Sequence, residues 1–396
     1  MSQALRPKAI IIGSSDVIKL CTIRAVGEFG YDVDVIHYVE KNLLKPIDFY
    51  SKYVKNAYII DKSEEGSLVR FLLENYTNPT HKPIIFTLDD FPTFVIDNAR
   101  ETLKDKFLFS HLTNGEGLVG LMDKHLQKNL AEESGFNVVK GWPILYEDGT
   151  YKIPVDIKYP CFIKGLYSYH VSKRIQRKCN NAEELLALLE DCKKYYPFAV
   201  YAEEFIEINK EFGVIGACNG EEYVIPAKAE FVEMGRSYKA GVSLLGHVMP
   251  LDSNSDLLKK TAMFLSKLHY VGLFNIDFIE SNGRTYFVEL NLRFAAYGYG
   301  VLRAGVNLPA ICINYLMQNE NHLKGELNKD CYYMNEKAAF SNVLEKGITM
   351  KEYKAMKRKA GVLLIADPSD PKPNKGFRKN YLIKYLKLSF MGIMHR

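Results

Sequence analysis

The sequence contains no uninterrupted apolar run of about 18 residues, the length that a membrane-spanning helix needs. Its first apolar run, Ala9 to Ile12, is too short for the core of a signal peptide. The composition also lacks the extremes of disordered, collagen-like or coiled-coil chains, since 47% of the residues are apolar and 25% are charged. We therefore expect a globular, cytoplasmic protein.

Cysteines in metal-binding or redox spacing are missing as well. The seven cysteines are scattered, odd in number and never spaced as C-x-x-C. This pattern favours reduced, buried thiols over a disulfide framework or a zinc site.

A general excess of one charge is also absent, because 52 basic residues face 47 acidic ones. Residues 371–396 carry seven of the basic residues and no acidic one, so the rest of the chain has a net charge of −2. A nearly neutral body argues against a nucleic-acid binder. The basic segment also has apolar residues at helical spacing. This predicts a helix that either docks on the body or makes peripheral contact with an anionic membrane surface. The oligomeric state stays open.

The length of 396 residues predicts two or three domains. In the first third, β-rich and amphipathic segments alternate, which predicts a mostly parallel sheet covered by helices on both faces. A ligand crevice is expected at the carboxyl ends of such strands. The predicted strands are 8–12, 33–37, 54–60 and 83–88, and the predicted helices are 16–29, 68–76 and 94–103.

The turn at residues 13–16 follows the first strand and opens the first helix, where a dinucleotide fingerprint or a P-loop would stand. It lacks the second and third glycines of G-x-G-x-x-G and the G-K-[ST] of a P-loop. We interpret it as a plain connection between strand and helix.

After Gly120 the pattern changes to strands typical of antiparallel sheets, with a hairpin turn at residues 281–284. The predicted fold class is therefore α/β followed by α+β. The predicted domains are a parallel-sheet domain at 1–118, a two-part domain with antiparallel sheets at 119–325, divided near residue 205, and a C-terminal extension at 326–396 with the basic amphipathic tail.

The strongest chemical signal lies on this hairpin. Because side chains alternate along a strand, Glu289, Asn291 and Arg293 project from one face while Val288 and Leu290 point into the core. Asp277 lies on the partner strand and faces the same way. Two carboxylates and an amide oxygen suit Mg²⁺, and an arginine beside them suits phosphate or carboxylate. A salt-bridged surface is the alternative, but it does not explain the asparagine between the charges.

This string resembles the metal-binding hairpin of the ATP-grasp superfamily, and further motifs follow in that superfamily's order over roughly residues 8–320. The resemblance implies a two-part ATP-grasp fold that binds ATP with one or two Mg²⁺ ions, or Mn²⁺. The metal ligands that it implies are Asp277, Glu289 and Asn291. The cofactor-binding residues that it implies are Lys124 and Lys164 at the phosphates, Glu203, Glu204, Phe205 and Ile206 at the adenine, and Glu211 at the ribose.

The resemblance further implies an ATP-dependent carboxylate–amine ligase that forms a C–N bond through an acyl phosphate, with Arg293 and Lys164 in catalysis. Its substrates would be a small-molecule carboxylate and an amine. The layout resembles carbamoyl-phosphate-synthase-like proteins and ligases that attach D-aspartate or other amino acids to cell-wall or surface-polysaccharide precursors. Arg236 and Lys239 are candidates to pair a substrate acid, the alternative being a solvated loop.

The sequence departs from the superfamily after Lys164. A glycine- and serine-rich loop usually follows, but here residues 165–174 contain a single glycine, with Tyr167, Ser168, Tyr169 and His170 as candidate donors. An alternative function is therefore a module that holds nucleotide without ligase turnover.

Overall fold

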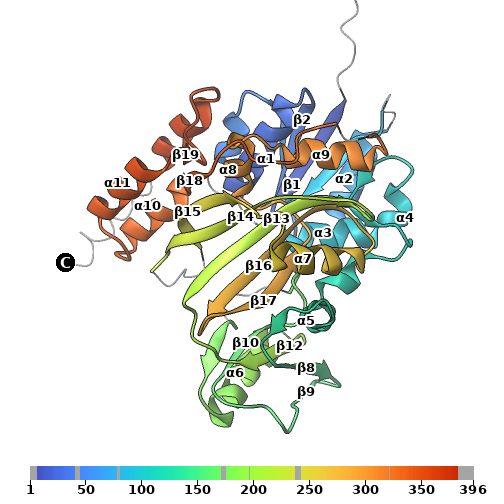
Figure 1. Ribbon diagram of the computed structural model, residues 1–396. Helices are drawn as coiled ribbons and strands as arrows, with labels where there is room; N and C mark the ends of the chain where they lie inside the picture. The colour runs from blue at the N-terminus through green and yellow to red at the C-terminus, as the bar shows by residue number, and fades with distance from the viewer. Residues whose placement is uncertain are drawn as a thin grey trace, which may run out of the picture.

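The computed structural model describes residues 7–40, 45–77, 81–170, 175–195, 197–236, 242–320 and 322–381. It contains a parallel sheet and two largely antiparallel sheets, so the predicted fold class is confirmed. In Figure 1 the small antiparallel sheet lies at the lower end of the molecule, below the large sheet, and the parallel sheet lies at the upper end.

The first domain is a parallel sheet of five strands in the order β3-β2-β1-β4-β5. Its apolar residues fill two cores, because α1 covers one face while α2 and α3 cover the other. The elements are β1 (Lys8–Gly13), α1 (Asp16–Glu28), β2 (Asp32–Val39), the 3-10 helix η1 (Ile47–Tyr50), β3 (Val54–Asp61), α2 (Ser67–Asn75), β4 (Ile84–Thr87), α3 (Asp90–Asn98), α4 (Arg100–Leu103) and β5 (Leu108–Phe109).

The small subdomain is an antiparallel sheet in the order β11-β10-β12-β8-β9, and α6 packs on it. A connector made of the 3-10 helix η2 (Leu118–Met122) and α5 (Lys124–Glu133) leads into it. The elements are β8 (Gly141–Glu147), β9 (Thr150–Lys152), β10 (Cys161–Gly165), β11 (Arg177–Cys179), α6 (Ala182–Tyr195) and β12 (Val200–Glu204). The buried residues of its core all come from this subdomain.

The large sheet runs in the order β19-β18-β15-β14-β13-β16-β17-β7, with β6 (His111–Leu112) paired to β16. Helices α5 and α7 pack on one face, and α8 and α9 pack on the other. The strands are β7 (Asn137–Val138), β13 (Lys210–Asn219), β14 (Tyr223–Met234), β15 (Ser243–Pro250), β16 (Tyr270–Ser281), β17 (Arg284–Asn291), β18 (Cys331–Met334) and β19 (Val362–Leu363). The helices are α7 (Asp256–Ser266), α8 (Gly298–Arg303), α9 (Leu308–Leu316), α10 (Glu336–Leu344) and α11 (Met350–Lys359).

The β16–β17 hairpin has one irregularity that strict alternation did not predict. Asp277 is opposite Glu289, but Phe278 is opposite Phe287, so Val288 is an extra residue in β17. The prediction that Val288 points into the core is therefore wrong: it is only partly buried, whereas Leu290 is in the core. The bulge keeps both Phe287 and Leu290 in one core and turns Glu289 toward the opposite face.

The C-terminal segment is fixed to the first domain by a buried ion pair. Arg24 of α1 donates from Nε to Asp370 Oδ2 at 3.1 Å, and both side chains are fully buried. Arg24 also donates to the carbonyls of Leu364 and Ile365 at 3.0 and 2.8 Å. Asp370 accepts from the Ser51 hydroxyl at 2.7 Å. One arginine thus joins the first helix to the end of the chain.

The first part of the basic tail, up to residue 381, is helical and lies on the body. The Tyr381 ring packs edge-on against Phe340 of α10 at 4.6 Å, and its hydroxyl donates to the Lys337 carbonyl at 2.9 Å. Phe377 is also buried. Residues 382–396 carry the apolar stripe on which both the docking and the membrane alternative depend, and they lie outside the described residues. No helix within the described ranges is long and apolar enough to cross a bilayer.

Replacement of Arg24 by leucine should lower the free energy of unfolding by about 3–5 kcal/mol, because Asp370 stays buried without its cation. Urea denaturation measures the change. Arg70→Leu is the matched control: Arg70 pairs with Glu64 at 2.8 Å on the surface, and its loss should cost less than about 1 kcal/mol. Equal losses in the two variants would contradict the prediction.

Candidate active site

A cavity of about 760 Å³ lies where the carboxyl edge of the parallel sheet meets the end of β17 and the end of β10. Its walls thus come from three separate parts of the chain. The first domain contributes Ser14, Glu40, Lys62, Asp89, Asp90 and Phe91. The connector and small subdomain contribute Lys124, Lys164, Ser168, Tyr169, His170, Gln176 and Phe198, and β17 with the residues after it contributes Glu289, Asn291 and Arg293.

The hairpin brings the predicted metal ligands together. Asp277 and Glu289 are directly opposite each other on β16 and β17. Asn291 donates from Nδ2 to Asp277 Oδ2 at 3.1 Å, and Arg293 donates to Asn291 Oδ1 at 3.1 Å. Arg293 also pairs with Asp90 Oδ1 of the first domain at 3.4 Å. The arginine therefore links the hairpin to the parallel sheet.

The donor chemistry of this group fits a divalent cation. Burial, together with the neighbouring Glu289 carboxylate, raises the pKa of Asp277 to about 7. A cation between the two carboxylates relieves that repulsion. Among the residues with described positions, no group of three or more His, Cys, Asp or Glu side chains forms an all-protein cage. Two carboxylates and one amide oxygen leave positions for water and phosphate, which is the usual situation of Mg²⁺.

Two of the predicted lysines reach the cavity. Lys124 is the first residue of α5, whose N-cap Asp123 accepts from the His125 backbone N–H at 2.7 Å. Its ammonium lies 3.3 Å from Ser168 Oγ and 3.9 Å from Glu289 Oε2, and burial lowers its pKa. Lys164, near the end of β10, is buried as well. Both ammonium groups thus line the same cavity as Glu289, and that of Lys124 lies closest to this carboxylate.

Glu203 holds a role that the sequence interpretation missed. Burial alone would raise its pKa, but Lys164 at 2.8 Å and Lys128 at 2.5 Å lower that pKa to about 2. Glu203 therefore holds Lys164 in a buried ion pair, while its predicted place at the adenine stays a prediction. Lys128 was not predicted, although its position four residues after Lys124 on α5 places both on one helix face.

The remaining predicted nucleotide residues lie outside the wall of this cavity. The backbone N–H groups of Glu204 and Phe205 donate to the carbonyls of Lys140 and Pro160, so a base must be read by other groups of this segment, which also includes Ile206. Glu211 lies on the sheet face that carries Asp277, two residues before Gly213, which is the partner of Asp277.

The loop after Lys164 is packed rather than open. The backbone carbonyl of Leu166 accepts from the Lys124 N–H at 3.0 Å. Tyr169 stacks on Phe94 of α3 at 4.2 Å, and His170 stacks on Phe198 at 4.7 Å. Aromatic contacts thus hold this loop against α3 and the small subdomain. Residues 171–174 lie outside the described part of the chain.

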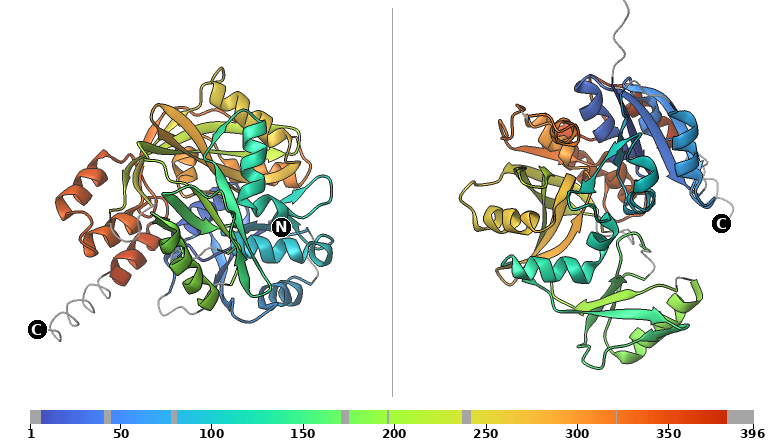
Figure 2. Two further views of the ribbon diagram at one scale, coloured as in Figure 1. Left: turned by 90° about the horizontal axis from the view of Figure 1, so that it is seen from below. Right: turned by 90° about the vertical axis from the view of Figure 1, so that its right-hand side faces the viewer.

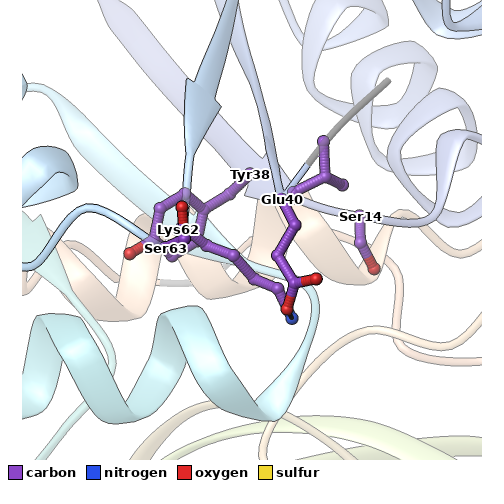
Figure 3. A pocket seen from close by; sticks show the side chains of 6 residues that line it. Ser14, Tyr38, Glu40, Lys62 and Ser63 are labelled. Atoms are coloured by element: carbon purple, nitrogen blue, oxygen red, sulfur yellow. Dashed lines mark ion pairs between the residues drawn. The ribbon is translucent and has the colours of Figure 1, made fainter. Parts of the chain in front are cut away.

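A second cavity, here called the annex, adjoins the first and has a volume of about 610 Å³ (Figure 3). It is lined by Ser14, Tyr38, Val39, Glu40, Lys62 and Ser63, of which Ser14, Glu40 and Lys62 also line the larger cavity. Glu40 and Lys62 form an ion pair at 3.3 Å. The turn at 13–16 is thus part of a cavity wall, which its interpretation as a plain connection did not predict.

The residues of this first-domain wall were missed because they are far apart in the sequence. Glu40, Lys62 and Asp89 each follow a strand of the parallel sheet. The rule that ligands bind at the carboxyl edge was the available signal, but it points to an edge and not to particular side chains.

Arg236, one of the two residues predicted to pair a substrate acid, does not line the cavity. Arg236 follows β14, and its guanidinium pairs with Glu233 at 3.2 Å and Glu352 of α11 at 3.1 Å. It is about half exposed and lies among surface charges, so the solvated alternative describes it. Lys239 lies outside the described residues.

Comparisons with known proteins agree with this geometry. No protein-family profile matches the chain. The carbamoyl phosphate synthase large chain of Agathobacter rectalis is 22% identical over 184 residues, which are 46% of this chain and 17% of that protein. The C-terminal section of the same enzyme from Methanocaldococcus jannaschii is 23% identical over 184 residues, which are 46% of this chain and 29% of that protein. The chain thus spans less than a third of these relatives.

Solved structures match most of the chain in fold. The biotin carboxylase domain of the Hydrogenobacter thermophilus 2-oxoglutarate carboxylase, solved with MgADP and bicarbonate, has a TM-score of 0.62 at 18% identity and covers 83% of this chain and 74% of that one. Staphylococcus aureus N5-carboxyaminoimidazole synthetase with ADP has a TM-score of 0.61 at 15% identity, over 90% and 89%. Bacillus licheniformis L-amino acid ligase has 0.59 at 14%, over 83% and 80%. The resemblance to the ATP-grasp fold is therefore confirmed.

Replacement of Gln127 by methionine should loosen the hairpin. Gln127 donates to the Leu290 carbonyl at 3.0 Å and accepts from the Leu290 N–H at 2.9 Å, between Glu289 and Asn291. Loss of both hydrogen bonds leaves the buried N–H and carbonyl of Leu290 unpaired, which should lower the free energy of unfolding by roughly 2 kcal/mol or more. Urea denaturation and faster amide exchange in β17 are the measurements. Leu126→Met, on the exposed side of α5, should change neither, and an unchanged β17 in Gln127→Met would refute the role.

Proposed function

We propose that this chain, with its ATP-grasp fold, is an ATP- and Mg²⁺-dependent ligase that joins a carboxylate to an amine. The observation that carries the proposal is the cavity lined by Lys124, Lys164, Arg293, Glu289 and Asn291. Asp277 lies directly opposite Glu289 on the neighbouring strand. Ammonium groups, a guanidinium and paired carboxylates are the groups that bind a nucleoside triphosphate with its metal. The fold of the ligases and carboxylases above supports the same chemistry.

In the first step, an oxygen of the carboxylate attacks the γ-phosphorus of ATP and the bond to the β-phosphate oxygen breaks. The products are an acyl phosphate and ADP. Lys124 and Lys164 hold the phosphates as point charges, and Arg293 binds the transferring group with its forked donors. Asp277, Glu289 and Asn291 would hold Mg²⁺, which would supply positive charge to neutralise the phosphates. In the second step the amine attacks the acyl carbon, inorganic phosphate leaves, and the amine loses a proton.

The first-domain wall is where we place the amine substrate. Asp89, Asp90 and Glu40 make this side of the cavity acidic, which suits a cationic or amine-bearing molecule. The annex gives the acceptor room beyond the reacting group. Lys62, paired with Glu40, offers a counter-charge to an acid group on the same molecule. An amino acid or another amine that carries a carboxylate fits this pair of charges.

Two finer points stay predictions. A cell-wall or surface-polysaccharide acceptor has no particular support in the lining residues. Peripheral membrane contact through the basic tail depends on residues 382–396, outside the described ranges.

ADP release in the presence of Mg²⁺ tests the function. The protein is incubated with ATP, bicarbonate or a D- or L-amino acid as the carboxylate, and a second amino acid as the amine. Substrate-dependent release of ADP and phosphate supports the ligase. Tight ATP binding without phosphate release across the whole panel would support the alternative of a nucleotide-binding module.

Glu289→Gln should reduce ADP release at least about 100-fold at moderate Mg²⁺, because it removes the charge of one metal ligand while keeping its volume. Glu280→Gln is the matched control on the same hairpin. Glu280 pairs with Lys210 at 3.6 Å on the surface, and its replacement should leave turnover unchanged. Full activity in a folded Glu289→Gln protein would remove Glu289 from the site.

Arg293→Lys should also lose activity by roughly 100-fold or more, because one ammonium cannot hold Asn291, Asp90 and a phosphoryl group at once. The unfolding midpoint should change little if the lysine still neutralises Asp90. An active Arg293→Lys enzyme would show that the guanidinium is structural.

A further inference from the structure

One buried hydroxyl beside the carboxylate pair has no partner. Tyr297 is 5% exposed, and its phenol oxygen makes no hydrogen bond to any described residue. An unpaired buried hydroxyl is costly, and most such groups in proteins are satisfied. The hydroxyl of Tyr297 therefore needs an explanation.

The position of this hydroxyl follows from a glycine in β13. A Cβ atom at Gly213 would lie 2.4 Å from the Tyr297 oxygen, so only glycine leaves room for the phenol. Gly213 is directly opposite Asp277, and Asp277 is directly opposite Glu289. Residues opposite each other in antiparallel strands project to the same face. The hydroxyl thus lies on the face of the two carboxylates, one strand further along the sheet.

The same arrangement occurs once more, with a different outcome. Tyr333 of β18 lies over Gly246 of β15, where a Cβ would be 2.5 Å from the phenol oxygen. The rings of Tyr297 and Tyr333 are 6.4 Å apart. Tyr333, however, donates to Ser243 Oγ at 3.1 Å. Of two neighbouring phenols seated on glycines, the one further from the carboxylates is satisfied and the one nearer to them is not.

The nearby guanidinium of Arg293 defines what this hydroxyl can bind. Arg293 precedes Tyr297 by four residues and lines the cavity. Burial raises the pKa of the Tyr297 phenol, and the charge of Arg293 acts more weakly to lower it. A phenol and a guanidinium both donate, so together they suit an oxyanion rather than an amine. The carboxylate substrate, which carries two acceptor oxygens, is the group of the proposed reaction that matches both donors.

We propose that the hydroxyl of Tyr297 binds the carboxylate substrate by donating a hydrogen bond to its acyl oxygen, beside Arg293. This proposal rests on the proposed function. It makes Tyr297 a substrate-binding residue whose hydroxyl is left unpaired by the protein itself. Removal of that hydroxyl breaks no hydrogen bond within the described protein, so substrate binding falls without a loss of stability.

The reverse of the first step provides the assay. An oxygen of the β-phosphate of ADP attacks the phosphorus of acetyl phosphate or carbamoyl phosphate. The bond from phosphorus to the acyl oxygen breaks, and its electron pair stays on the departing carboxylate. ATP formed from MgADP is measured by luminescence at varied acyl phosphate and varied MgADP. Urea denaturation of each variant gives stability separately.

Tyr297→Phe should raise the KM for the acyl phosphate by roughly 10-fold, as expected for one hydrogen bond to a charged group. Its KM for MgADP and its unfolding midpoint should be unchanged. Tyr333→Phe is the matched control and should show the opposite pattern, with a lower unfolding midpoint and an unchanged KM for the acyl phosphate.

The possible failures are distinct. Wild-type kinetics in Tyr297→Phe would overturn the assignment, as would a destabilised variant whose KM for the acyl phosphate is unchanged, since the hydroxyl would then serve the fold. Absence of ATP formation by the wild-type protein with both acyl phosphates, together with absence of ADP release across the carboxylate panel, would overturn the ligase function and this assignment with it.

Discussion

Two carboxylates facing each other across neighbouring strands are the constraint on which the rest of the cavity depends. Asp277 and Glu289 share one sheet face, and like charges at this spacing cannot both be ionised in a buried site without compensation. Burial, together with the Glu289 carboxylate, raises the pKa of Asp277. Asn291 offers a neutral donor, Arg293 approaches from the residues that follow β17, and Lys124 approaches from α5. In the proposed function, a divalent cation with its nucleotide would complete the compensation.

The cationic side chains of the cavity are themselves held in ion pairs by carboxylates outside the Asp277–Glu289 pair. Glu203 fixes Lys164 between β10 and β12, and Asp90 fixes Arg293 at the start of α3. Each ion pair compensates a buried charge in the absence of ligand. This lowers the free-energy cost of burying the cation beside the cavity. The same pairs fix where each cation lies: Lys164 lies beside β12, and Arg293 lies at the boundary between the hairpin and the parallel sheet.

Local pattern was enough to predict the hairpin, because period-two alternation and a two-residue turn fix which side chains share a face. It failed at Val288, where a bulge adds a residue without a recognisable signal in the sequence. It failed more widely for Glu40, Lys62 and Asp89, whose proximity depends on how three strands align. Tyr297 was missed for another reason: its significance lies in a missing partner and in the glycine beneath it, and both are properties of the packed sheet.

The distribution of the cores indicates which walls of the cavity are fixed. One apolar core contains Leu20 of the first domain, Ile215 of the large sheet and Ile365 near the C-terminus, and the Arg24–Asp370 pair joins the same parts. The small subdomain has a separate core. It lies at the lower end of the right-hand view in Figure 2. Tyr297 belongs to the first, shared core, whereas Lys164 lies on β10 of the small subdomain. The β16–β17 hairpin packs in a further core together with α5 and α7. Packed cores resist continuous deformation, so we expect movement to occur between the small subdomain and the rest of the protein. In the proposed reaction, adjustment to the nucleotide then falls to the small subdomain.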